Sequence, residues 1–518
     1  MIEKLTFRWL LLILLIIPWV NGGVDELPHM AFAVATAILA IGVGVVIFRE
    51  KERQVPIGLF PLVLGLLLIG SHLIPINRID SPLFPSAAFE LRKELYSYVW
   101  PAENSPDQMF PHSLYPSGTR MQLADFCMAV VFFLAGAYIA NKRRAFRQLC
   151  ILMLINGSAI AVVSIVHRFS KSNELLWWVE VRGWSTIFGP FVYHNLAGSF
   201  FVFALGCGCA LMVRDLHDSY EQNAQRGTSI VDMIDGARRF VGDLNVWRLT
   251  LITLTAFVSV ALLFSLSRGA VISAVFGLLG LSGCLALTFS KQKIFLSGSV
   301  IALSVIVVLF SYRMLDPVTE RFTGLLEQET YEKEGRLRHW SDALANIDRF
   351  KETGAGFGSY VFLHRLADSH GNRAMWHHAH NQYIEALVEG GYFALLLLLA
   401  QIAIVGFTSF RLLSDRSSFK RIVATTVIFV LVSQTVHGWF DYCHYLPSAM
   451  MLTALFCGMA FMGREKNDQP SSSRGSFARY AVSIGLPIIA LLSCVEIIRN
   501  EGVQFELSEF PWRKIFAR

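Results

Sequence analysis

The chain has 518 residues and a formal net charge of +6, and 54% of its residues are hydrophobic whereas 16% are charged. Its mean hydropathy of +0.49 is too high for a soluble globular domain and indicates a polytopic membrane protein. The small positive charge gives no reason to expect a nucleic acid partner. Most of the eight cysteines lie in apolar stretches, which favours small core residues over a disulfide or zinc framework.

Apolar stretches of about the length that crosses a bilayer recur along the whole chain. They predict an all-α transmembrane bundle of about 12–13 spans. We place the spans near residues 9–21, 30–48, 56–74, 123–140, 149–167, 192–213, 249–265, 269–289, 294–311, 384–408, 422–437, 446–462 and 480–497. The first stretch could also be a signal peptide, but no small-residue cleavage site follows Val20, which favours an anchored helix.

Lys and Arg occur in every second loop, which predicts that these loops are cytoplasmic. This alternation puts the N-terminus inside and the tail 498–518 outside. We therefore divide the chain into spans 1 to 9 within residues 1–311, a large periplasmic loop at 312–383, and spans 10 to 13 within 384–497. Two further outer loops are expected at 75–120 and 168–191. The second carries Trp177, Trp178 and Trp184, which favour an interfacial aromatic belt over sugar stacking.

The stretch from Met375 to Leu396 combines three histidines and an asparagine with the start of a membrane-length apolar run. Titratable groups at the end of a membrane helix predict a function, although solvated loop residues are the simpler alternative. His380 and Asn381 at a helix N-terminus would suit an anion. Glu385 and Glu389 would suit the helix dipole in the first turns. Gly390 and Gly391 predict a bend before the membrane-spanning run.

Further candidates lie in other segments expected on the outer side. A very short turn carries Arg268, whose guanidinium suits phosphate, although a snorkelling side chain is the alternative. In the large outer loop, a helical period predicts a helix with Leu337, Trp340, Leu344 and Ile347 on one face, and Gly354 and Gly356 are expected to end it. Arg336, Arg338 and His339 lie on or near that helix and therefore face the same compartment as Arg268. Another helix begins with His194 and Asn195, and Ala197 and Gly198 then favour close helix packing. Asp441 and His444 lie in a later turn and could support the site.

Four motifs in order resemble those of the O-antigen ligase and O-antigen polymerase superfamily of bacterial envelope glycan transferases. The first is a Gly-x-Phe-x-x-x-Asn-x-x-Ala helix entry (Gly189, Phe191, Asn195), in which the small residue comes one place early at Ala197. The second is a Ser-x-Ser-Arg-Gly turn (Ser265, Ser267, Arg268, Gly269). The third is an Arg-x-x-x-Trp helix with a following Gly-x-Gly (Arg336, Trp340, Gly354, Gly356). The fourth and most specific runs from His380 and Asn381 to Glu389 and Gly391.

The resemblance spans roughly residues 185–460 and implies a helical bundle with one large periplasmic loop in the bacterial inner membrane. It implies transfer of a glycan from undecaprenyl pyrophosphate to an acceptor hydroxyl, without a metal ion or other cofactor. It assigns His380 as the essential histidine and Arg268 as a pyrophosphate ligand. The chain departs from the pattern where some ligases carry another Arg, because His194 lies close to that point, and in having a thirteenth helix.

The chemistry of such a transfer is consistent with these residues. Lipid pyrophosphate is a good leaving group, so the site needs cations for two phosphates and a base for the incoming hydroxyl. Arg268 with Arg336 or Arg338 would supply the cations, and His194, Asn195 and Asn381 are further substrate-binding candidates. His380 would supply the base.

Several alternatives stay open at this point. The acceptor could be lipid A-core, a growing glycan or a protein, so that ligase, polymerase and protein oligosaccharyltransferase are not separated. A transporter would need paired charges near the bilayer midplane and internal repeats, and no clear repeat is found. A metal site on His377 and His380 lacks a nearby third ligand in the sequence. His377 and His378 do not occupy the family's histidine position, and we expect their removal to be tolerated.

Overall fold

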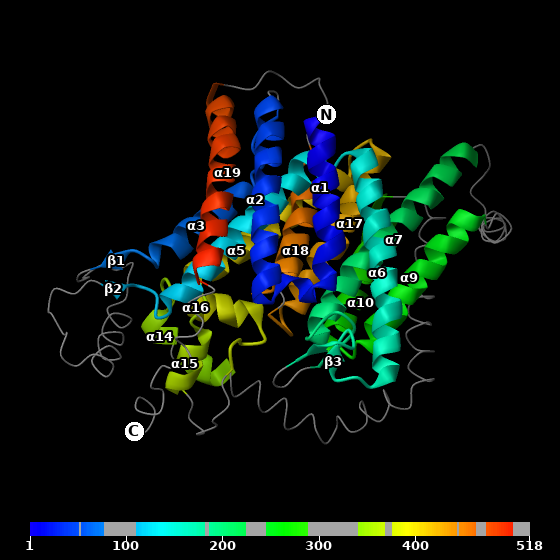
Figure 1. Cartoon of the computed structure of the whole chain (residues 1–518). Coiled ribbons are helices and arrows are strands. Elements are labelled where there is room, and N and C mark those ends of the chain that lie inside the picture. Colours follow the sequence, from blue (N-terminus) through cyan, green and yellow to red (C-terminus); the bar gives the residue numbers. More distant parts are fainter. Residues whose placement is uncertain are drawn as a thin grey trace, which may run out of the picture.

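The structure is a computed structural model, and it describes residues 1–50, 53–76, 110–181, 186–223, 245–288, 340–345, 347–367, 376–442, 445–462 and 473–500. Within these ranges the chain is an all-α bundle, as predicted, with two small β-hairpin pairings (Figure 1). Nine of the described helices are long and apolar enough to cross a membrane. The multi-pass membrane architecture expected from hydropathy is confirmed.

The N-terminal half begins with α1 (Ile2–Ile16), two 3-10 turns (Ile17–Trp19 and Asn21–Gly23) and α2 (Glu26–Arg49). It continues with α3 (Leu59–Ser71), α5 (Pro116–Ala135), a π-helical turn (Gly136–Ala140) and α6 (Arg143–Ser170). Helix α1 lies earlier than the span predicted at 9–21, and α3 is shorter than the span predicted at 56–74. The two apolar stretches therefore predicted that both helices exist, but they did not predict the residues at which the helices begin and end.

The site is carried mainly by the helices that follow. They are α7 (His194–Asn223), α9 (Val246–Phe264), α10 (Arg268–Thr288), α16 (Gln382–Leu413), α17 (Ser418–His437), α18 (Pro447–Met459) and α19 (Ser473–Asn500). The short α14 (Ile347–Phe350) and α15 (Tyr360–Ala367) precede α16. The span predicted at 294–311 and the tail from 501 onward lie outside the described residues, as do Arg336, Arg338, His339 and His444.

Helices α5 and α7 lie at the centre of the bundle, because 89% of the apolar window of each is buried inside the protein. Only 17% of the corresponding window of α16 is buried, so this helix presents most of its membrane run to the surroundings. Small residues allow close contact in the interior. A Cβ on Gly136 would lie 2.0 Å from the carbonyl oxygen of Leu455, and one on Gly458 would lie 1.9 Å from that of Phe133. Helices α5 and α18 therefore pack backbone to backbone.

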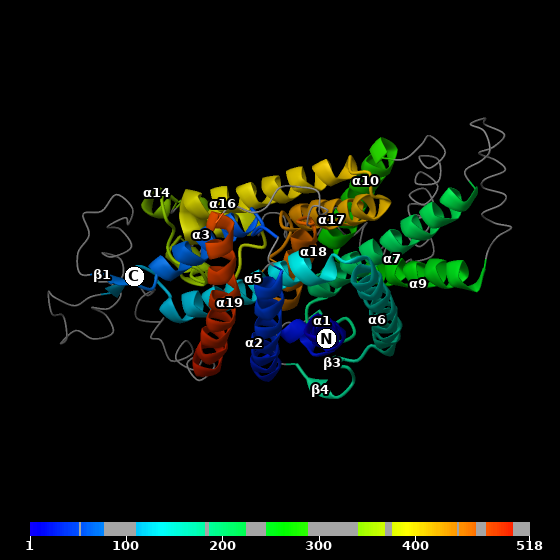
Figure 2. The ribbon, with the colours of Figure 1, turned by 90° about the horizontal axis from the view of Figure 1, so that it is seen from above.

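Helices α1, α2, α6 and α19 stand side by side in Figure 1, and α2 contacts both α1 and α19. Figure 2 gives the view from above and shows α16 along the edge of the bundle, beside α17. The N-terminus lies at one end of the bundle, and α14, α15 and β3 lie at the opposite end. This placement agrees with the alternation predicted from the basic loops, whereas the compartment at each end stays a prediction.

Two pairings of short strands lie in segments predicted to be outer loops. The first joins β1 (Pro75–Ile76) to β2 (Phe110–Pro111), and the second joins β3 (Glu174–Leu175) to β4 (Val179–Glu180), both antiparallel. The indole N–H of Trp177 donates to Ser170 Oγ at 2.8 Å, while Trp178 is 72% exposed. The exposed Trp178 is compatible with an interfacial belt, which stays a prediction.

Candidate functional site

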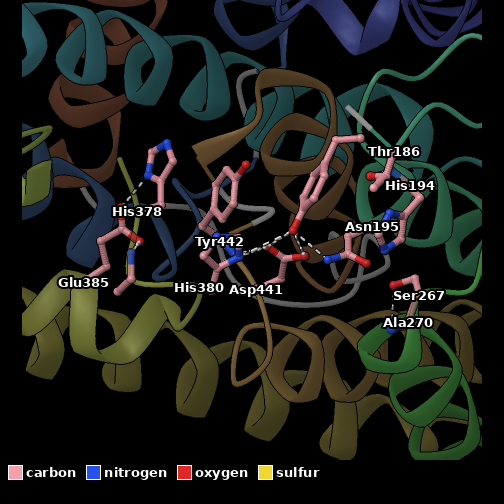
Figure 3. A network of polar contacts seen from close by, with 12 residues as sticks. Thr186, His194, Asn195, Ser267, Ala270, His378, His380, Glu385, Asp441 and Tyr442 are labelled. Carbon is pink, nitrogen blue, oxygen red and sulfur yellow. Dashed lines mark hydrogen bonds and ion pairs between the residues drawn. The ribbon is translucent and has the colours of Figure 1, made fainter. Parts of the chain in front are cut away.

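The site lies where the entry to α7, the turn after α17 and the start of α16 meet (Figure 3). Each of these segments ends or begins a membrane helix at the same end of the bundle. The entry to α7 supplies Tyr193, His194 and Asn195, and the turn after α17 supplies Asp441. The segment before α16 supplies His380. Residues separated by as many as 248 positions therefore lie within hydrogen-bond distance.

His380 faces a buried carboxylate. Its Nδ1 lies 3.5 Å from Asp441 Oδ1 and 3.4 Å from the Tyr193 hydroxyl, and its side chain is 18% exposed. Asp441 is fully buried and also accepts a hydrogen bond from the backbone N–H of Tyr442 at 2.8 Å. An Nδ1 proton directed at a carboxylate leaves the lone pair on Nε2, so His380 is arranged as a base through Nε2.

Tyr193 links Asp441 to the start of α7. Its hydroxyl lies 3.1 and 3.0 Å from the two carboxylate oxygens of Asp441, to which it donates. The Asn195 amide donates to the same hydroxyl at 2.6 Å. Asn195 thus reaches the site indirectly and orients Tyr193. The sequence reasoning missed Tyr193, and its position directly before the His-Asn pair was the available signal.

The charge state of Asp441 follows from these contacts. Burial alone would raise the pKa of this carboxyl group. The hydrogen bond and charge of His380, the charge of His437 and the Tyr442 N–H act in the opposite direction and outweigh it, so the pKa of Asp441 is lowered. Asp441 is therefore a carboxylate at neutral pH.

Arg268 lies beside this cluster as the first residue of α10, and it is exposed. The turn that carries it is fixed by close packing on both sides. A Cβ on Gly198 would lie 2.9 Å from Ser267 Cβ, and one on Gly269 would lie 2.8 Å from Phe440 Cβ. Ser267 Oγ accepts the N–H of Ala270 at 3.3 Å and caps the helix. In the part of the chain that the structure describes, no carboxylate pairs with Arg268.

The small residues after Asn195 do pack closely, as predicted, because Gly198 contacts the Arg268 turn. His194 lies on the same side as Asn195 in Figure 3, and its backbone N–H donates to Thr186 Oγ1 at 3.5 Å. Its side chain is half-buried. The structure thus brings His194, Asn195, Arg268 and His380 into one region, and their substrate-binding roles remain predictions.

Asn381 has a structural task in addition to any contact with substrate. Its Oδ1 accepts the N–H groups of Tyr383 at 3.0 Å and Ile384 at 3.1 Å, so it is the N-cap of α16. These backbone N–H groups at the helix N-terminus are the donors that a bound anion would need, and the Asn381 side chain already occupies them. Asn381 is also fully buried. Both facts reduce the case for an anion at this N-terminus.

Glu385 and Glu389 lie in the first turns of α16, as predicted, and both are fully buried. Glu385 Oε1 lies 2.6 Å from His378 Nδ1. Glu389 accepts the N–H of Tyr360 at 2.9 Å through Oε1 and the hydroxyl of Tyr445 through Oε2. These two carboxyl groups fasten the segments around the site to α16. Their i, i+4 spacing on one helix face was the signal in the sequence.

The glycine-containing segment 353–358 packs against the first turns of α16 rather than forming a cradle for a nucleotide. The N–H groups of Ala355 and Gly356 donate to the carbonyl oxygens of Val388 at 3.1 Å and Glu389 at 2.9 Å. Gly354 and Gly356 have φ of +81° and +106°, so they end the preceding helix as predicted. Before these glycines, Leu344 is 38% exposed, whereas Ala343 and Phe350 are buried.

An apolar cavity of about 240 Å³ lies between α3, α5, α16, α17 and α18. Gln382 and Tyr383 line it directly after the His380 segment, and Leu62, Phe126 and Leu398 are among its apolar lining residues. In the described ranges no group of three or more His, Cys, Asp or Glu side chains is placed to hold a metal ion.

Comparison with known proteins gives one family. Residues 253–399 match the family model described as O-Antigen ligase, and no curated protein matches the chain. The matched segment contains the Arg268 turn and the motif from His380 to Gly391, whereas the Asn195 motif precedes it. Residues 253–399 therefore resemble the O-antigen ligase family, as the motifs predicted, within a chain whose described helices fit a multi-pass membrane protein.

Proposed function

We propose that this protein is an O-antigen ligase-like glycosyltransferase that moves a glycan from undecaprenyl pyrophosphate to an acceptor hydroxyl on the periplasmic face of the inner membrane. The observation that carries the proposal is the His380–Asp441 contact, with Nδ1 and Oδ1 3.5 Å apart, in the region that also holds the exposed Arg268. The family match supports a glycosyltransferase of this general kind.

The reaction is a single displacement at the anomeric carbon. Nε2 of His380 accepts the proton of the acceptor hydroxyl as the new carbon–oxygen bond forms. The bond between the anomeric carbon and the pyrophosphate oxygen breaks, and its electron pair leaves with undecaprenyl pyrophosphate. The configuration at the anomeric carbon is thereby inverted.

Asp441 and Arg268 have separate tasks in this scheme. The Asp441 carboxylate keeps the Nδ1 proton of His380 in place and stabilises the imidazolium that forms, while Tyr193 holds the carboxylate. Arg268 binds the pyrophosphate through its guanidinium, which suits two phosphate oxygens at once. Arg336 and Arg338 are proposed as further phosphate ligands from the sequence alone. A base in this position contributes roughly 10²- to 10⁴-fold.

The apolar cavity favours a lipid-linked donor over a soluble sugar nucleotide. It begins beside Gln382, two residues after His380, and extends between membrane helices. A polyprenyl chain can occupy such a cavity while its pyrophosphate stays at the helix ends near Arg268. The polar, charged nucleotide of a sugar nucleotide would gain no favourable contact from the apolar walls of this cavity.

The test is transfer by the purified protein in liposomes that contain an undecaprenyl-pyrophosphate-linked oligosaccharide. Lipid A-core, a second lipid-linked glycan and an acceptor protein are offered separately, and the product distinguishes ligase, polymerase and protein oligosaccharyltransferase. Activity should persist in EDTA, because the scheme uses cationic side chains in place of a metal. Folded protein without transfer to any acceptor, or activity that EDTA removes and zinc or magnesium restores, would contradict the proposal.

A further inference from the structure

The segment before α16 is held in a conformation that it does not adopt by itself. Residues 376–379 have no regular structure, and His380 has φ of +50°, in the left-handed region that residues with a side chain rarely occupy. The neighbours must impose this geometry. The Trp340 indole N–H donates to the Ala379 carbonyl at 2.7 Å, and the N–H of Gln382 donates to the Gly438 carbonyl at 2.7 Å.

His378 provides another anchor for this segment. Its Nδ1 lies 2.6 Å from Oε1 of Glu385, whose side chain is completely buried, while the side chain of His378 is 27% exposed. The other carboxylate oxygen of Glu385 accepts the N–H of Ala379 at 3.2 Å. One buried carboxylate thus binds two consecutive residues, directly before His380. Loss of either partner would leave a buried polar group unsatisfied, which is costly.

The His378 ring also contacts the segment that carries Asp441. It stacks on the Tyr442 ring with centroids 4.1 Å apart and planes 12° from parallel. The Tyr193 ring lies near Tyr442 as well, in a stacked orientation at 5.6 Å, and His380 meets Tyr442 edge-on at 4.9 Å. Figure 3 shows the Tyr442 ring next to His378. His378 therefore touches the supports of both partners in the His380–Asp441 pair.

We infer that His378, held by Glu385, is a positioning residue that sets the orientation of His380 relative to Asp441. The inference rests on the proposed function, since it concerns the same reaction. His378 is assigned the positioning role because it contacts Glu385 and Tyr442, whereas His380 lies beside Asp441 and Tyr193. The expectation that both His377 and His378 can be removed without effect is thereby restricted to His377, which is exposed.

The experiment measures kcat and the donor KM of four variants in the liposome assay. His378→Ala should lower kcat about tenfold or more with little change in KM, because it removes a contact that orients the base and none that binds the donor. His378→Asn should restore most of the rate, because its amide lies near the Nδ1 position and can still donate to Glu385. His378→Gln places its amide further out and should not. His377→Ala is the matched control and should behave like wild type.

A double substitution separates positioning from general stability. In a His380→Ala background, His378→Ala should cause no further loss of kcat, because the residue acts through His380. If His378→Ala lowered kcat in the His380→Ala background by the same factor as in wild type, the inference would be overturned. Wild-type kcat in His378→Ala, or equal activity of His378→Asn and His378→Gln, would also overturn it. If His378→Ala does not fold by size exclusion, the comparison of Asn with Gln decides. Wild-type protein without any transfer would instead refute the proposed function.

Discussion

His380 and Arg268 are expected to fail in different ways when each is replaced. His380→Ala should lower kcat by roughly 10²- to 10⁴-fold and leave donor binding nearly intact, because a base acts mainly on the transition state. Arg268→Ala should weaken donor binding as well as the rate, and Lys should rescue only partly because it lacks the planar fork. Steady-state kinetics with a titrated lipid-linked donor measure both effects. An active His380→Ala variant would remove His380 from the mechanism.

Asp441 should matter through the tautomer of His380. In Asp441→Asn the side-chain amide can donate an N–H to Nδ1 of His380. The imidazole then carries its proton on Nε2, which no longer has the lone pair that accepts the proton of the acceptor hydroxyl. We expect a loss of kcat of about 10²-fold or more. Tyr193→Phe keeps the carboxylate and removes one of its donors, so it should lose about tenfold or less. Equal activity of Asp441→Asn and wild type would contradict the role of the carboxylate.

Two histidines with lowered pKa values predict a dependence of stability on pH. Burial lowers the pKa of His378 to about 4 and, together with the neighbouring His112, that of His72 to about 3. As the pH falls from 6.5 towards 4, the unfolded chain binds protons at these positions while the native protein resists them, so the free energy of unfolding decreases. The melting temperature in detergent should therefore fall more steeply over this window in wild type than in His378→Asn. Equal slopes of the two proteins would contradict a lowered pKa of His378.

At the residue level, the sequence predicted which residues could carry the chemistry better than it predicted the contacts that these residues make. His380, Arg268 and Asp441 could be chosen because titratable groups at the edge of an apolar run are costly to keep near lipid, so a function is the default hypothesis for them. The buried pairing of Glu385 with His378 could not, because it depends on how the segment 376–381 folds back on α16. Tyr193 was missed for the same reason, since its partner Asp441 lies 248 positions away.

At the level of elements, the bend within α16 was predicted from two glycines and is present. Gly391 has φ of +67° and ψ of −170°, a backbone conformation that other residues avoid. A Cβ there would lie 2.3 Å from the carbonyl oxygen of Glu352. The N–H of Tyr392 donates to the Lys351 carbonyl at 2.7 Å, so the bend docks α16 on the segment before it.

Gly391→Ala should therefore destabilise the protein by at least about 1–3 kcal/mol, from backbone strain and from the close contact. The melting temperature and kcat should both fall, since the His380 segment is fastened to the first turns of α16. Gly485→Ala in α19 is the matched control, because no atom lies within 4 Å of a Cβ there. It should be neutral or slightly stabilising. Equal melting temperatures of the two variants would show that the bend is not required.

Helix ends explain why prediction was less exact for other elements. Hydropathy located the described spans, but it cannot distinguish a helix that continues beyond the membrane from one that stops within it. Helix α7 therefore extends to Asn223, ten residues past its predicted end, while α18 is only 13 residues long. Packing sets these limits, as shown by the backbone contact of Gly458 with Phe133.

For the whole molecule, the arrangement of the helices agrees with the alternation of basic loops, which also predicts the compartments. The β3 hairpin and α14 lie at the end of the bundle opposite to the N-terminus. The site lies at that same end, beside α15 and the start of α16. If the basic loops are cytoplasmic, the site is periplasmic, where a lipid-linked glycan would be used after its transfer across the membrane.

Cysteine labelling of intact cells tests this orientation. Lys171, directly after α6, and Ser414, directly after α16, are both exposed and lie outside helices. The alternation puts Lys171 outside and Ser414 inside, so a membrane-impermeant maleimide should label Lys171→Cys in intact cells and label Ser414→Cys only after the membrane is opened. The described native cysteines are buried, which limits background. The reverse pattern would place His380 on the cytoplasmic face, where a sugar nucleotide would again be a possible donor, and the proposed mechanism would have to be abandoned.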